Sequence, residues 1–386
     1  MSFFAHPLVA TMSGAGFDKI ENTMPITRRA ILATAASLAR LAAQTRPLRL
    51  ALAGLEHGHA SGFLRALQSR QDVTLSGMFD PSKPLLEKYA KQFKLDTSPV
   101  FTDLDKMLDE VKPAAVATFT STFDHVAVVR ACAKRKIPVM MEKPLAVSNE
   151  HAREIAELAH QSGIPVMVNY ETTWYRSHHA MWDLLKHQRA IGDVRKMVAM
   201  DGHQGPKEIG VGPEFLNWLT DPVKNGAGAL FDFGCYGANL MTWMMDNQRP
   251  LSVTARVLHI KPHIYAKVDD EANILVEYPK AIGIIEGSWN WPFSRKDFEL
   301  YAESGYANAI GGNVLKIRRK DDKQEEITTP HELNQDIRDS VSHLSAITRG
   351  AIKPGALSSL ENNLIVTEIL VAARESAKTG RTVKLG

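Results

Sequence analysis

Short apolar runs alternate with amphipathic stretches over the first half of the chain, between residues 47 and 169. The runs have strand length and end at glycine or a polar residue, whereas the stretches between them repeat apolar residues at helical spacing. The predicted strands are Leu48–Ala53, Val73–Phe79, Val100, Ala114–Thr120, Ile137–Met141 and Ile164–Val168, and the predicted helices are Gly62–Gln68, Pro84–Phe93, Leu104–Glu110, His125–Lys136 and Glu150–Gln161. Strands that alternate with helices form βαβ units with right-handed crossovers. The pattern therefore predicts an α/β N-terminal domain at 47–169, with the doubly wound parallel sheet of a dinucleotide-binding Rossmann domain.

The pattern changes after about residue 170, where longer strands follow one another. The predicted strands are Val194–His203, Ser252–His263, Asn273–Tyr278, Ile282–Trp289, Phe298–Glu303 and Val314–Arg319. Several of them alternate apolar and polar residues, which is typical of a mostly antiparallel sheet with one covered and one free face. An amphipathic helix is predicted over Leu360–Ala377. Residues 170–386 are therefore expected to form an α+β C-terminal domain with a large open sheet, used for substrate binding and oligomerisation.

The first 46 residues follow neither pattern. Arg28 and Arg29 form a twin-arginine pair, which precedes the short apolar run from Ile31 to Ala39 and the small residues Ala42-Ala43. This order resembles a twin-arginine export signal, and the run is too short to span a bilayer. We expect a periplasmic or otherwise exported protein whose translation starts at Met24. The alternative is a disordered tail on a cytoplasmic protein.

Composition narrows the class of partner. The formal net charge is +3 over 386 residues, which argues against a nucleic-acid-binding surface. The two cysteines, Cys132 and Cys235, are too few for a disulfide framework or a four-cysteine zinc site. The histidines lack the spacing of metal ligands, so no metal site is expected. We therefore expect a small-molecule substrate, no nucleic acid and no integral membrane segment.

The stretch Met141-Glu142-Lys143-Pro144-Leu145-Ala146 carries the most specific chemical signal in the chain. It follows the apolar residues Ile137 to Met140, so Lys143 lies at the carboxyl end of a predicted parallel strand. In open α/β sheets, ligands bind outside the carboxyl ends of the strands. The lysine–proline pair fixes the backbone direction there, and we expect it to direct the ammonium group into a ligand cleft.

The segment Gly54-Leu55-Glu56-His57-Gly58-His59 follows the first predicted strand, where a dinucleotide fingerprint requires G-x-G-x-x-G. Gly54 allows the tight turn, but Glu56 replaces the second glycine and carries a charge of the wrong sign to face phosphate. Asp80 ends the second strand, where a carboxylate accepts hydrogen bonds from ribose hydroxyls and repels a 2′-phosphate. These residues favour NAD, while Ser82-Lys83 leave NADP open. The alternative for Asp80 is a turn or helix-capping role.

Seven short motifs follow one another along nearly the whole chain after residue 48. The motifs are Phe79-Asp80-Pro81, His125, Glu142-Lys143-Pro144-Leu145-Ala146, Ile191-Gly192-Asp193-Val194, Gly226-Ala227-Gly228-Ala229-Leu230-Phe231-Asp232-Phe233-Gly234-Cys235-Tyr236, Gly287-Ser288-Trp289 and Glu375-Ser376-Ala377-Lys378-Thr379-Gly380-Arg381. In order and spacing the chain resembles the Gfo/Idh/MocA family, of the glucose–fructose oxidoreductase and inositol dehydrogenase type. The resemblance implies reversible hydride transfer between a nicotinamide cofactor and a sugar or polyol carbon.

The resemblance also implies a site. Lys143 is expected near the nicotinamide and the reacting oxygen, with Asp232 and the residue four positions later completing the catalytic group. That later residue is usually histidine in the family, whereas here it is Tyr236, as in the glucose–fructose oxidoreductase branch. The expected cofactor-binding residues are Gly54, Glu56, His57, Asp80, Thr120, His125, Glu142 and Lys143.

Tyr236 suits proton transfer with a substrate hydroxyl. An unperturbed tyrosine has a pKa of about 10, and a neighbouring ammonium such as that of Lys143 is expected to lower this pKa toward the working pH. Asp232 would hold a second hydroxyl or orient Lys143. The alternative is that Tyr236 is a half-buried aromatic on a helix, near glycines that mark a turn. The expected substrate-binding residues are Lys143, Trp174, Arg176, His203, Asp232 and Tyr236.

Three functions stay open at this point. They are an exported nicotinamide-dependent oxidoreductase of sugars, polyols or sugar derivatives, an NAD-dependent glycoside hydrolase that works by oxidation and elimination, and a sugar-binding protein without a cofactor. We also expect a homodimer or homotetramer, because Asn273–Tyr278 and Ile282–Trp289 place apolar side chains on both faces of the sheet. The alternative is that residues 205–228 fold over the sheet or the cleft.

Overall fold

The computed structural model describes residues 46–95 and 99–386. The expected export signal around Arg28 and Arg29 and the expected start at Met24 lie outside the described residues. From Pro47 to Gly386 the chain forms one compact unit. Among the described residues, no helix has both the length and the apolar character that a membrane crossing requires.

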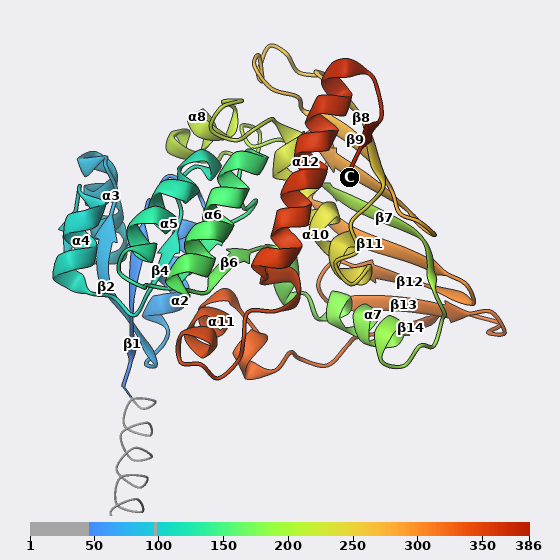
Figure 1. The fold of residues 1–386 in the computed structure, drawn as a ribbon, viewed down its shortest axis with the longest axis horizontal. Coiled ribbons are helices and arrows are strands. Elements are labelled where there is room, and N and C mark those ends of the chain that lie inside the picture. The colour runs from blue at the N-terminus through green and yellow to red at the C-terminus, as the bar shows by residue number, and fades with distance from the viewer. Residues whose placement is uncertain (1–45, 96–98) are drawn as a thin grey trace, which may run out of the picture. The chain divides into compact units, whose positions relative to one another are not determined.

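Within the described residues, six parallel strands form one sheet in the order β3-β2-β1-β4-β5-β6 (Figure 1). The strands are β1 (Leu48–Ala53), β2 (Val73–Phe79), β3 (Val100–Phe101), β4 (Ala115–Thr118), β5 (Val139–Glu142) and β6 (Val166–Asn169). The intervening helices are α2 (Ala60–Gln68), α3 (Lys83–Phe93), α4 (Leu104–Val111), η1 (Thr122–Asp124), α5 (His125–Ala133) and α6 (Asn149–Ser162). The predicted doubly wound parallel sheet is confirmed, and the predicted ends of its elements differ by a few residues.

Both faces of this sheet are covered by helices. Buried side chains of α4, α5 and α6, such as Val129 and Ile155, share a core with the strand residues Val116 and Val139. On the opposite face, α2 and α3 pack together with α11 (Ser340–Thr348), a helix from the far end of the chain. One of the helices that cover the parallel sheet, α11, therefore lies outside residues 47–169 in the sequence. The local sequence pattern could not indicate this packing.

The described part of the C-terminal half contains a nine-stranded sheet in the order β14-β13-β12-β11-β7-β10-β9-β8-β15. Its strands are β7 (Val194–Gly202), β8 (Ser252–Leu258), β9 (Glu271–Glu277), β10 (Ile282–Ser288), β11 (Arg295–Ala302), β12 (Gly305–Ile310), β13 (Val314–Arg319), β14 (Glu326–Thr328) and β15 (Val383–Lys384). Only the β7–β10 pair is parallel among these, so the predicted mostly antiparallel sheet is confirmed. The sequence did not indicate β12, β14 and β15, which are short or rich in small and charged residues.

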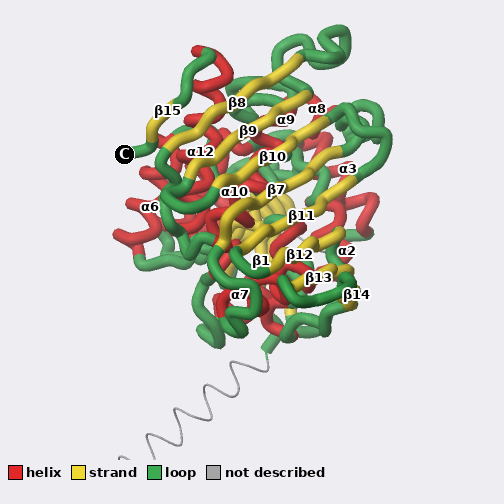
Figure 2. Tube along the Cα trace, turned by 90° about the vertical axis from the view of Figure 1, so that its right-hand side faces the viewer, coloured by secondary structure: helices red, strands yellow, loops and turns green. Residues whose placement is uncertain are grey.

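One face of this larger sheet is packed against helices, and the other shows its strands directly in Figure 2. The remaining elements are η2 (Glu171–Trp174), α7 (Arg176–Lys186), α8 (Pro213–Leu219), α9 (Ala229–Asp232), α10 (Gly234–Met244), η3 (Gln335–Ile337), η4 (Ala356–Ser358) and α12 (Leu360–Thr379). Strand β9 shows the expected alternation, because Ile274 and Val276 are buried while Leu275 is 39% exposed. The outward side of β9 and β10 thus carries apolar residues that no described helix covers.

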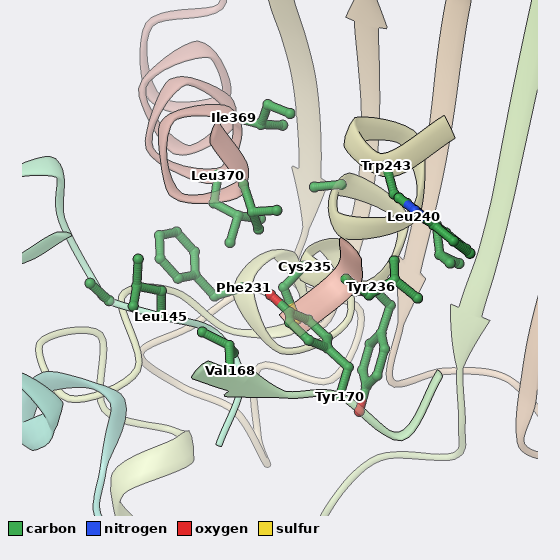
Figure 3. Packing of buried hydrophobic residues seen from close by; sticks show 14 of the residues in the cluster. Leu145, Val168, Tyr170, Phe231, Cys235, Tyr236, Leu240, Trp243, Ile369 and Leu370 are labelled. Atoms are coloured by element: carbon green, nitrogen blue, oxygen red, sulfur yellow. The ribbon is translucent and has the colours of Figure 1, made fainter. Parts of the chain in front are cut away.

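A shared core joins the two halves of the compact unit. Leu145 and Val168 from the parallel sheet pack near Phe231 and Cys235, and Leu370 of α12 lies against the same cluster (Figure 3). Cys132 and Cys235 are both buried free thiols and pack as small core residues. Because one core spans both sheets, the ends of the parallel strands are held in a defined position against α9 and α10.

Candidate active site

A cleft of about 1040 Å³ opens at the carboxyl ends of the parallel strands and is bounded by the larger sheet. The residues that follow β1, β5 and β6 meet the end of β7 and the start of β11 there. The lining includes the side chains of His57, His59, Lys143, Glu171, Tyr175, His203, Asp232, Tyr236, Lys296 and Asp297. The cleft lies where a doubly wound sheet places ligands. The structure therefore brings together the predicted catalytic residues Lys143, Asp232 and Tyr236.

Lys143 and Asp232 form a buried ion pair at the centre of the cleft. The ammonium of Lys143 donates to Oδ1 of Asp232 and, at 2.9 Å, to its backbone oxygen, while Trp289 Nε1 donates to Oδ2 at 2.9 Å. Burial opposes ionisation of the Asp232 carboxyl, but the Lys143 ammonium outweighs it and lowers this pKa to about 2. Burial also disfavours the charge of Lys143, and Asp232 overcomes it and raises the lysine pKa. Both groups are therefore charged at neutral pH. Of the two roles expected for Asp232, the ion pair agrees with the orientation of Lys143.

A second carboxylate fixes the segment that carries Asp232. Asp269 is buried, and its two oxygens accept from the backbone N–H groups of Gly228 at 2.8 Å and Leu230 at 2.7 Å. These are free donors at the start of α9, so the carboxylate stabilises the helix end. A side chain at Gly228 would meet the backbone oxygen of Asp269 at 1.8 Å. The glycine-rich approach to Asp232 is thus required for this close packing, and Asp269 is a positioning residue that the sequence pattern did not reveal.

The expected lowering of the Tyr236 pKa is wrong. The side chain is only 2% exposed, and burial, followed by the charge of Glu171, raises the pKa of the hydroxyl well above its ordinary value. Lys143 does lie nearby, with Nζ 5.1 Å from the ring centroid, but this contact is with the aromatic ring. Tyr236 is therefore a neutral hydroxyl at the working pH, able to donate a proton rather than to remove one as a phenolate.

Lys296 adds a second ammonium to the cleft. It begins β11, its Nζ donates to Glu171, and it lies 4.6 Å from the centroid of the Tyr236 ring. Burial opposes ionisation of Glu171, but Lys296 outweighs it and lowers the pKa of this carboxyl. Across the β7–β11 ladder lies Asp201, whose pKa is raised well above the ordinary range by burial. Neither Lys296 nor Glu171 was predicted, because strand pairing, and not spacing along the chain, brings them to Tyr236.

Gly54 makes the turn that the first βα unit needs. Its φ is +84°, and a Cβ atom there would lie 2.4 Å from Cγ2 of Thr120. Thr120 thus packs against the loop, and its hydroxyl donates to the backbone oxygen of Ser121 at 3.2 Å. The structure favours the turn role for Asp80, since its buried carboxylate accepts from the N–H groups of Leu55 and Ser82, each at 2.8 Å. The contact of Asp80 with a ribose stays a prediction.

The start of α2 fits a dinucleotide phosphate in spite of Glu56. The N–H groups of His59 and Ala60 at the start of α2 bond to His57, so an anion would be held by the N–H groups that follow them, on Ser61 and Gly62. Burial, and then the nearby Asp80, raise the pKa of the Glu56 carboxyl. Glu56 also lines a side hollow of about 560 Å³ with Ser82 and Lys224, beyond the end of β2. Gly54, the α2 N-terminus and this hollow are the parts that would hold NAD.

His57, His59 and Glu142 lie together beside the glycine loop. Their potential ligand atoms lie within 4.8 Å of one another, a grouping that the spacing along the chain did not reveal. Each has a protein partner: His57 Nδ1 accepts from His59 N–H at 3.1 Å, and His59 Nδ1 contacts Glu142 Oε2 at 3.1 Å. Glu142 Oε1 accepts from Asn169 Nδ2 at 2.7 Å. Glu142 thus pairs with nearby donors, and it faces the loop expected to hold the cofactor.

The remaining predicted residues separate into two groups. His203 lines the cleft, and its Nδ1 accepts from Gly205 N–H at 2.9 Å. His125 is buried behind the cleft, where its Nδ1 contacts the backbone oxygen of Leu145 at 3.2 Å and burial lowers its pKa to about 4. It supports the loop after Lys143, and it does not line the cleft.

The prediction that Trp174 and Arg176 line the cleft is wrong. The Trp174 indole donates to Asn169 at 3.1 Å and lines a separate cavity, while Arg176 bonds to Asn313 at 3.1 Å and to Glu332. Tyr175, between them, does line the cleft. The turn of η2 sends successive side chains to different surfaces, which an aromatic–basic run in the sequence cannot show.

Residues 206–225 cross the cleft from the larger sheet to the glycine loop. Phe215 and Trp218 of α8 pack on His57, with ring centroids 4.5 and 5.6 Å apart. Two ion pairs hold the same segment, Lys88 with Glu214 and Lys224 with Asp124, both at 2.7 Å. We call residues 206–225 the cleft strap. Its position agrees with the alternative expectation that residues 205–228 cover the cleft.

Comparison with known proteins identifies both halves of the chain. Residues 48–170 match the family model described as an oxidoreductase family with an NAD-binding Rossmann fold, and residues 163–308 match the Gfo/Idh/MocA C-terminal domain. A trans-1,2-dihydrobenzene-1,2-diol dehydrogenase of Xenopus laevis is 31% identical over 155 residues, which cover 40% of this chain and 42% of that protein. A D-apiose dehydrogenase of Rhizobium rhizogenes strain K84 is 23% identical over 286 residues, which cover 69% of this chain and 78% of that protein. The chain spans about half the length of the curated relatives it matches first.

Solved structures show the same fold at low sequence identity. An aldose-aldose oxidoreductase from Caulobacter crescentus, complexed with glycerol, superposes with a TM-score of 0.74 at 19% identity, covering 88% of this chain and all of that one. An inositol dehydrogenase homologue from Azotobacter vinelandii, complexed with NAD+, has a TM-score of 0.74 at 18% identity. The match covers 88% of this chain and 98% of that one. The two family models together span the parallel sheet, the cleft and most of the larger sheet. The chain therefore belongs to the Gfo/Idh/MocA oxidoreductase family, with an NAD-binding Rossmann domain at its N-terminal half.

Proposed function

We propose that the protein is an NAD-dependent oxidoreductase that transfers hydride to or from a hydroxyl-bearing carbon of a neutral sugar, polyol or cyclic diol. The observation that carries the proposal is the buried Lys143–Asp232 pair beside the neutral Tyr236, in a cleft that adjoins the dinucleotide loop. NAD, when bound, supplies the hydride acceptor or, as NADH, the donor. The residues of the chain supply binding and proton transfer.

Each of the three residues has a distinct task. Lys143 holds the reacting oxygen through an ammonium that Asp232 and Trp289 keep in place. Tyr236 donates its hydroxyl proton to that oxygen when a carbonyl is reduced, because its raised pKa keeps the proton on at neutral pH. In the reverse direction the proton of the alcohol returns to the tyrosine oxygen. At neutral pH the protonated tyrosine is therefore the form that can reduce a carbonyl, and the tyrosinate left after donation regains its proton from water.

The charges in the cleft favour a neutral substrate. Lys143 pairs with Asp232, Lys296 with Glu171, and Arg295 with Asp297, so the described cations that line the cleft are offset by carboxylates. A charged substrate would have to disrupt one of these pairs, and an unpaired buried charge is costly. Neutral hydroxyl groups of a substrate can form hydrogen bonds to these charged groups while the ion pairs stay intact. The names of the relatives, a cyclic diol dehydrogenase and an apiose dehydrogenase, agree with this class.

The purified protein and a substrate panel test the proposal. Mass spectrometry of the denatured protein shows whether NAD or NADP is retained, and NADH absorbance follows turnover of sugars, cyclitols and cyclic diols. Net reduction of the cofactor supports the proposal. Release of the aglycone from a glycoside without net reduction supports the glycosidase alternative, and failure to bind either dinucleotide supports a cofactor-free sugar-binding protein.

Replacing Lys296 with methionine is expected to raise KM for a diol by about tenfold or more while changing kcat little. The side chain lines the cleft beside Tyr236, and the loss of a hydrogen bond to a charged donor costs about 1.5–3 kcal/mol. Steady-state kinetics with a diol and with the matching mono-alcohol measure the effect. Lys316→Met, a paired lysine on the distant β13, is the control and should leave both constants unchanged. An unchanged diol KM in the Lys296 variant would remove this residue from substrate binding.

We also propose export through the twin-arginine route. Fusing residues 1–46 to a reporter that folds in the cytoplasm should deliver it to the periplasm, because the Arg28-Arg29 pair precedes a short apolar run. Arg28→Lys with Arg29→Lys should abolish delivery. Cell fractionation measures both, and reporter that stays in the cytoplasm with the native segment would rule the route out.

The uncovered face of the larger sheet supports the proposal of a homodimer or homotetramer. Leu275 is 39% exposed and Ile282 and Ile284 are half-buried on the outward side of β9 and β10. A two-fold contact would cover this surface on both copies. Light scattering at micromolar concentration should give a mass near two or four times 42.7 kDa, less any cleaved signal. A monomer would exclude this contact, and Leu275→Glu should weaken it.

A further inference from the structure

A second cavity, of about 650 Å³, lies between η2, α7, the end of α10 and residues 337–358. It shares no lining residue with the cleft among the described parts of the chain. We call it the tryptophan cavity, because Trp174, Trp182 and Trp243 line it. Its volume falls within the range of about 300–1000 Å³ that small-molecule sites occupy.

The walls of the tryptophan cavity are aromatic. Trp182 and Trp243 stack with ring centroids 5.5 Å apart and planes 2° from parallel. His179 lies 5.3 Å from Trp243, and His343 lies 5.4 Å from Trp174. Rings held in this way present rigid apolar surfaces, at a low entropic cost to any ligand that lies against them.

Three polar atoms of the lining have no hydrogen-bond partner among the described residues. They are Trp182 Nε1, His343 Nδ1 and Thr173 Oγ1. His343 is 4% exposed and Thr173 6%, and the other nitrogen of His343 bonds to Ser358 Oγ at 2.8 Å. A buried polar atom that lacks a partner costs about 1–3 kcal/mol, so three of them in one cavity require an explanation.

The interior of the tryptophan cavity carries no net charge. Burial lowers the pKa of His343 to about 4 and also lowers that of His179, so both imidazoles are neutral at pH 7. Asp246 pairs with Lys186 at 2.6 Å, and Lys353 is exposed at the rim. Asp246 and Lys353 line the cavity but are both exposed, so neither gives a charged ligand in the interior the buried counter-charge that its lost hydration requires.

We propose that the tryptophan cavity is a binding site for a neutral polyhydroxylated ring, a sugar or a cyclitol. The C–H face of such a ring lies on the indoles, and its hydroxyls can both donate and accept, which satisfies all three unpartnered atoms. A simple aromatic ring would leave these atoms unpaired. The site is separate from the reaction in the cleft and does not depend on it.

Gly355 offers a way to block the site. It lines the cavity, and a Cβ atom there would have its nearest contact at 3.8 Å, so leucine fits the backbone and extends into the open volume. Gly386, an exposed glycine with nothing within 4 Å of its Cβ position, gives a control outside both sites as Gly386→Leu. Trp182→Phe gives a second, milder variant that keeps the aromatic wall and removes the unpartnered Nε1.

The test titrates the full-length protein, with its cofactor, with myo-inositol and methyl β-D-glucopyranoside, and separately with phenol and benzoate. Intrinsic tryptophan fluorescence and calorimetry record binding. A saturable change is expected with the hydroxylated rings, and it should persist in Lys143→Met, where the cleft is altered. Gly355→Leu should weaken this binding by at least tenfold, and Trp182→Phe by about two- to tenfold, the loss of one hydrogen bond. Gly386→Leu should bind as the wild type does.

Three results would overturn the proposal. One is the absence of any saturable signal with both hydroxylated rings. Another is a signal that Gly355→Leu and Trp182→Phe leave unchanged, which would place the ring in the cleft. The third is tighter binding of phenol or benzoate than of the hydroxylated rings. Turnover of Gly355→Leu is measured alongside and should equal that of the wild type, so failure here is distinct from failure of the proposed reaction.

Discussion

Lys143→Met is expected to lower turnover by about 10²–10⁴-fold, the range that a positioned acid–base group contributes. The ammonium that holds the reacting oxygen is lost, while the Asp232 carboxylate stays buried with Trp289 as its remaining side-chain partner. Breaking a buried pair in this way destabilises a protein by about 3–5 kcal/mol, so the variant should also unfold at lower denaturant concentration. Steady-state rates and a denaturant titration measure the two effects.

The double variant Lys143→Met with Asp232→Asn separates these effects. The amide is uncharged and can still accept from Trp289, so most of the lost stability should return. Turnover should stay as low as in the single variant. Recovery of activity together with stability would show that Lys143 serves the fold and not the reaction.

Tyr236→Phe is expected to reduce turnover by about 10²–10⁴-fold with little loss of stability. The phenyl ring keeps the packing against Phe233 and Tyr170, whereas the proton donor is removed. The matched control is Tyr170→Phe, whose ring lies 5.6 Å away and whose hydroxyl donates to Asn363 at 2.9 Å, outside the cleft. That variant should lose about 1 kcal/mol of stability and keep full turnover. A normal rate in Tyr236→Phe at every pH would exclude tyrosine from the mechanism.

The pH dependence follows from the same residue. Because the folded pKa of Tyr236 is raised, its neutral form persists as the pH rises through the ordinary tyrosine range. The rate of carbonyl reduction should therefore show no tyrosine-dependent fall between pH 7 and about pH 10. Ultraviolet titration of tyrosinate in the wild type and in Tyr236→Phe should coincide over that interval.

Local patterns were sufficient for the parallel sheet, because each strand is a short buried run and each helix has a clear apolar face. They missed β12, whose six residues include three small ones, and they ended β8 too late, since its ladder with β9 ends at Leu258. The helix α11 shows another limit. Its sequence is helical, but nothing local indicates that it covers a sheet formed from the other end of the chain.

Site residues were predictable from the sequence where a single short motif contains them. The position of Lys143 after β5 and its pairing with Asp232 match the family pattern. The ionisation of Tyr236 was not predictable, since it depends on burial under side chains from several elements, with Lys296 placed by strand register. The backbone partners of Asp80, the N–H groups of Leu55 and Ser82, were not predictable either, because they are defined only when the loop is folded.

The cleft strap has a consequence for how long a dinucleotide stays bound. The strap follows β7 of the larger sheet and leads into α9. It contacts His57 of the glycine loop through Phe215 and Trp218, and it contacts α3 and η1 through two partly exposed ion pairs. Exposed pairs contribute little and are screened by salt, whereas buried aromatic contacts are not. We therefore expect the ring contacts at His57 to contribute more than the ion pairs to the residence time of a bound dinucleotide, so that this time changes little with ionic strength.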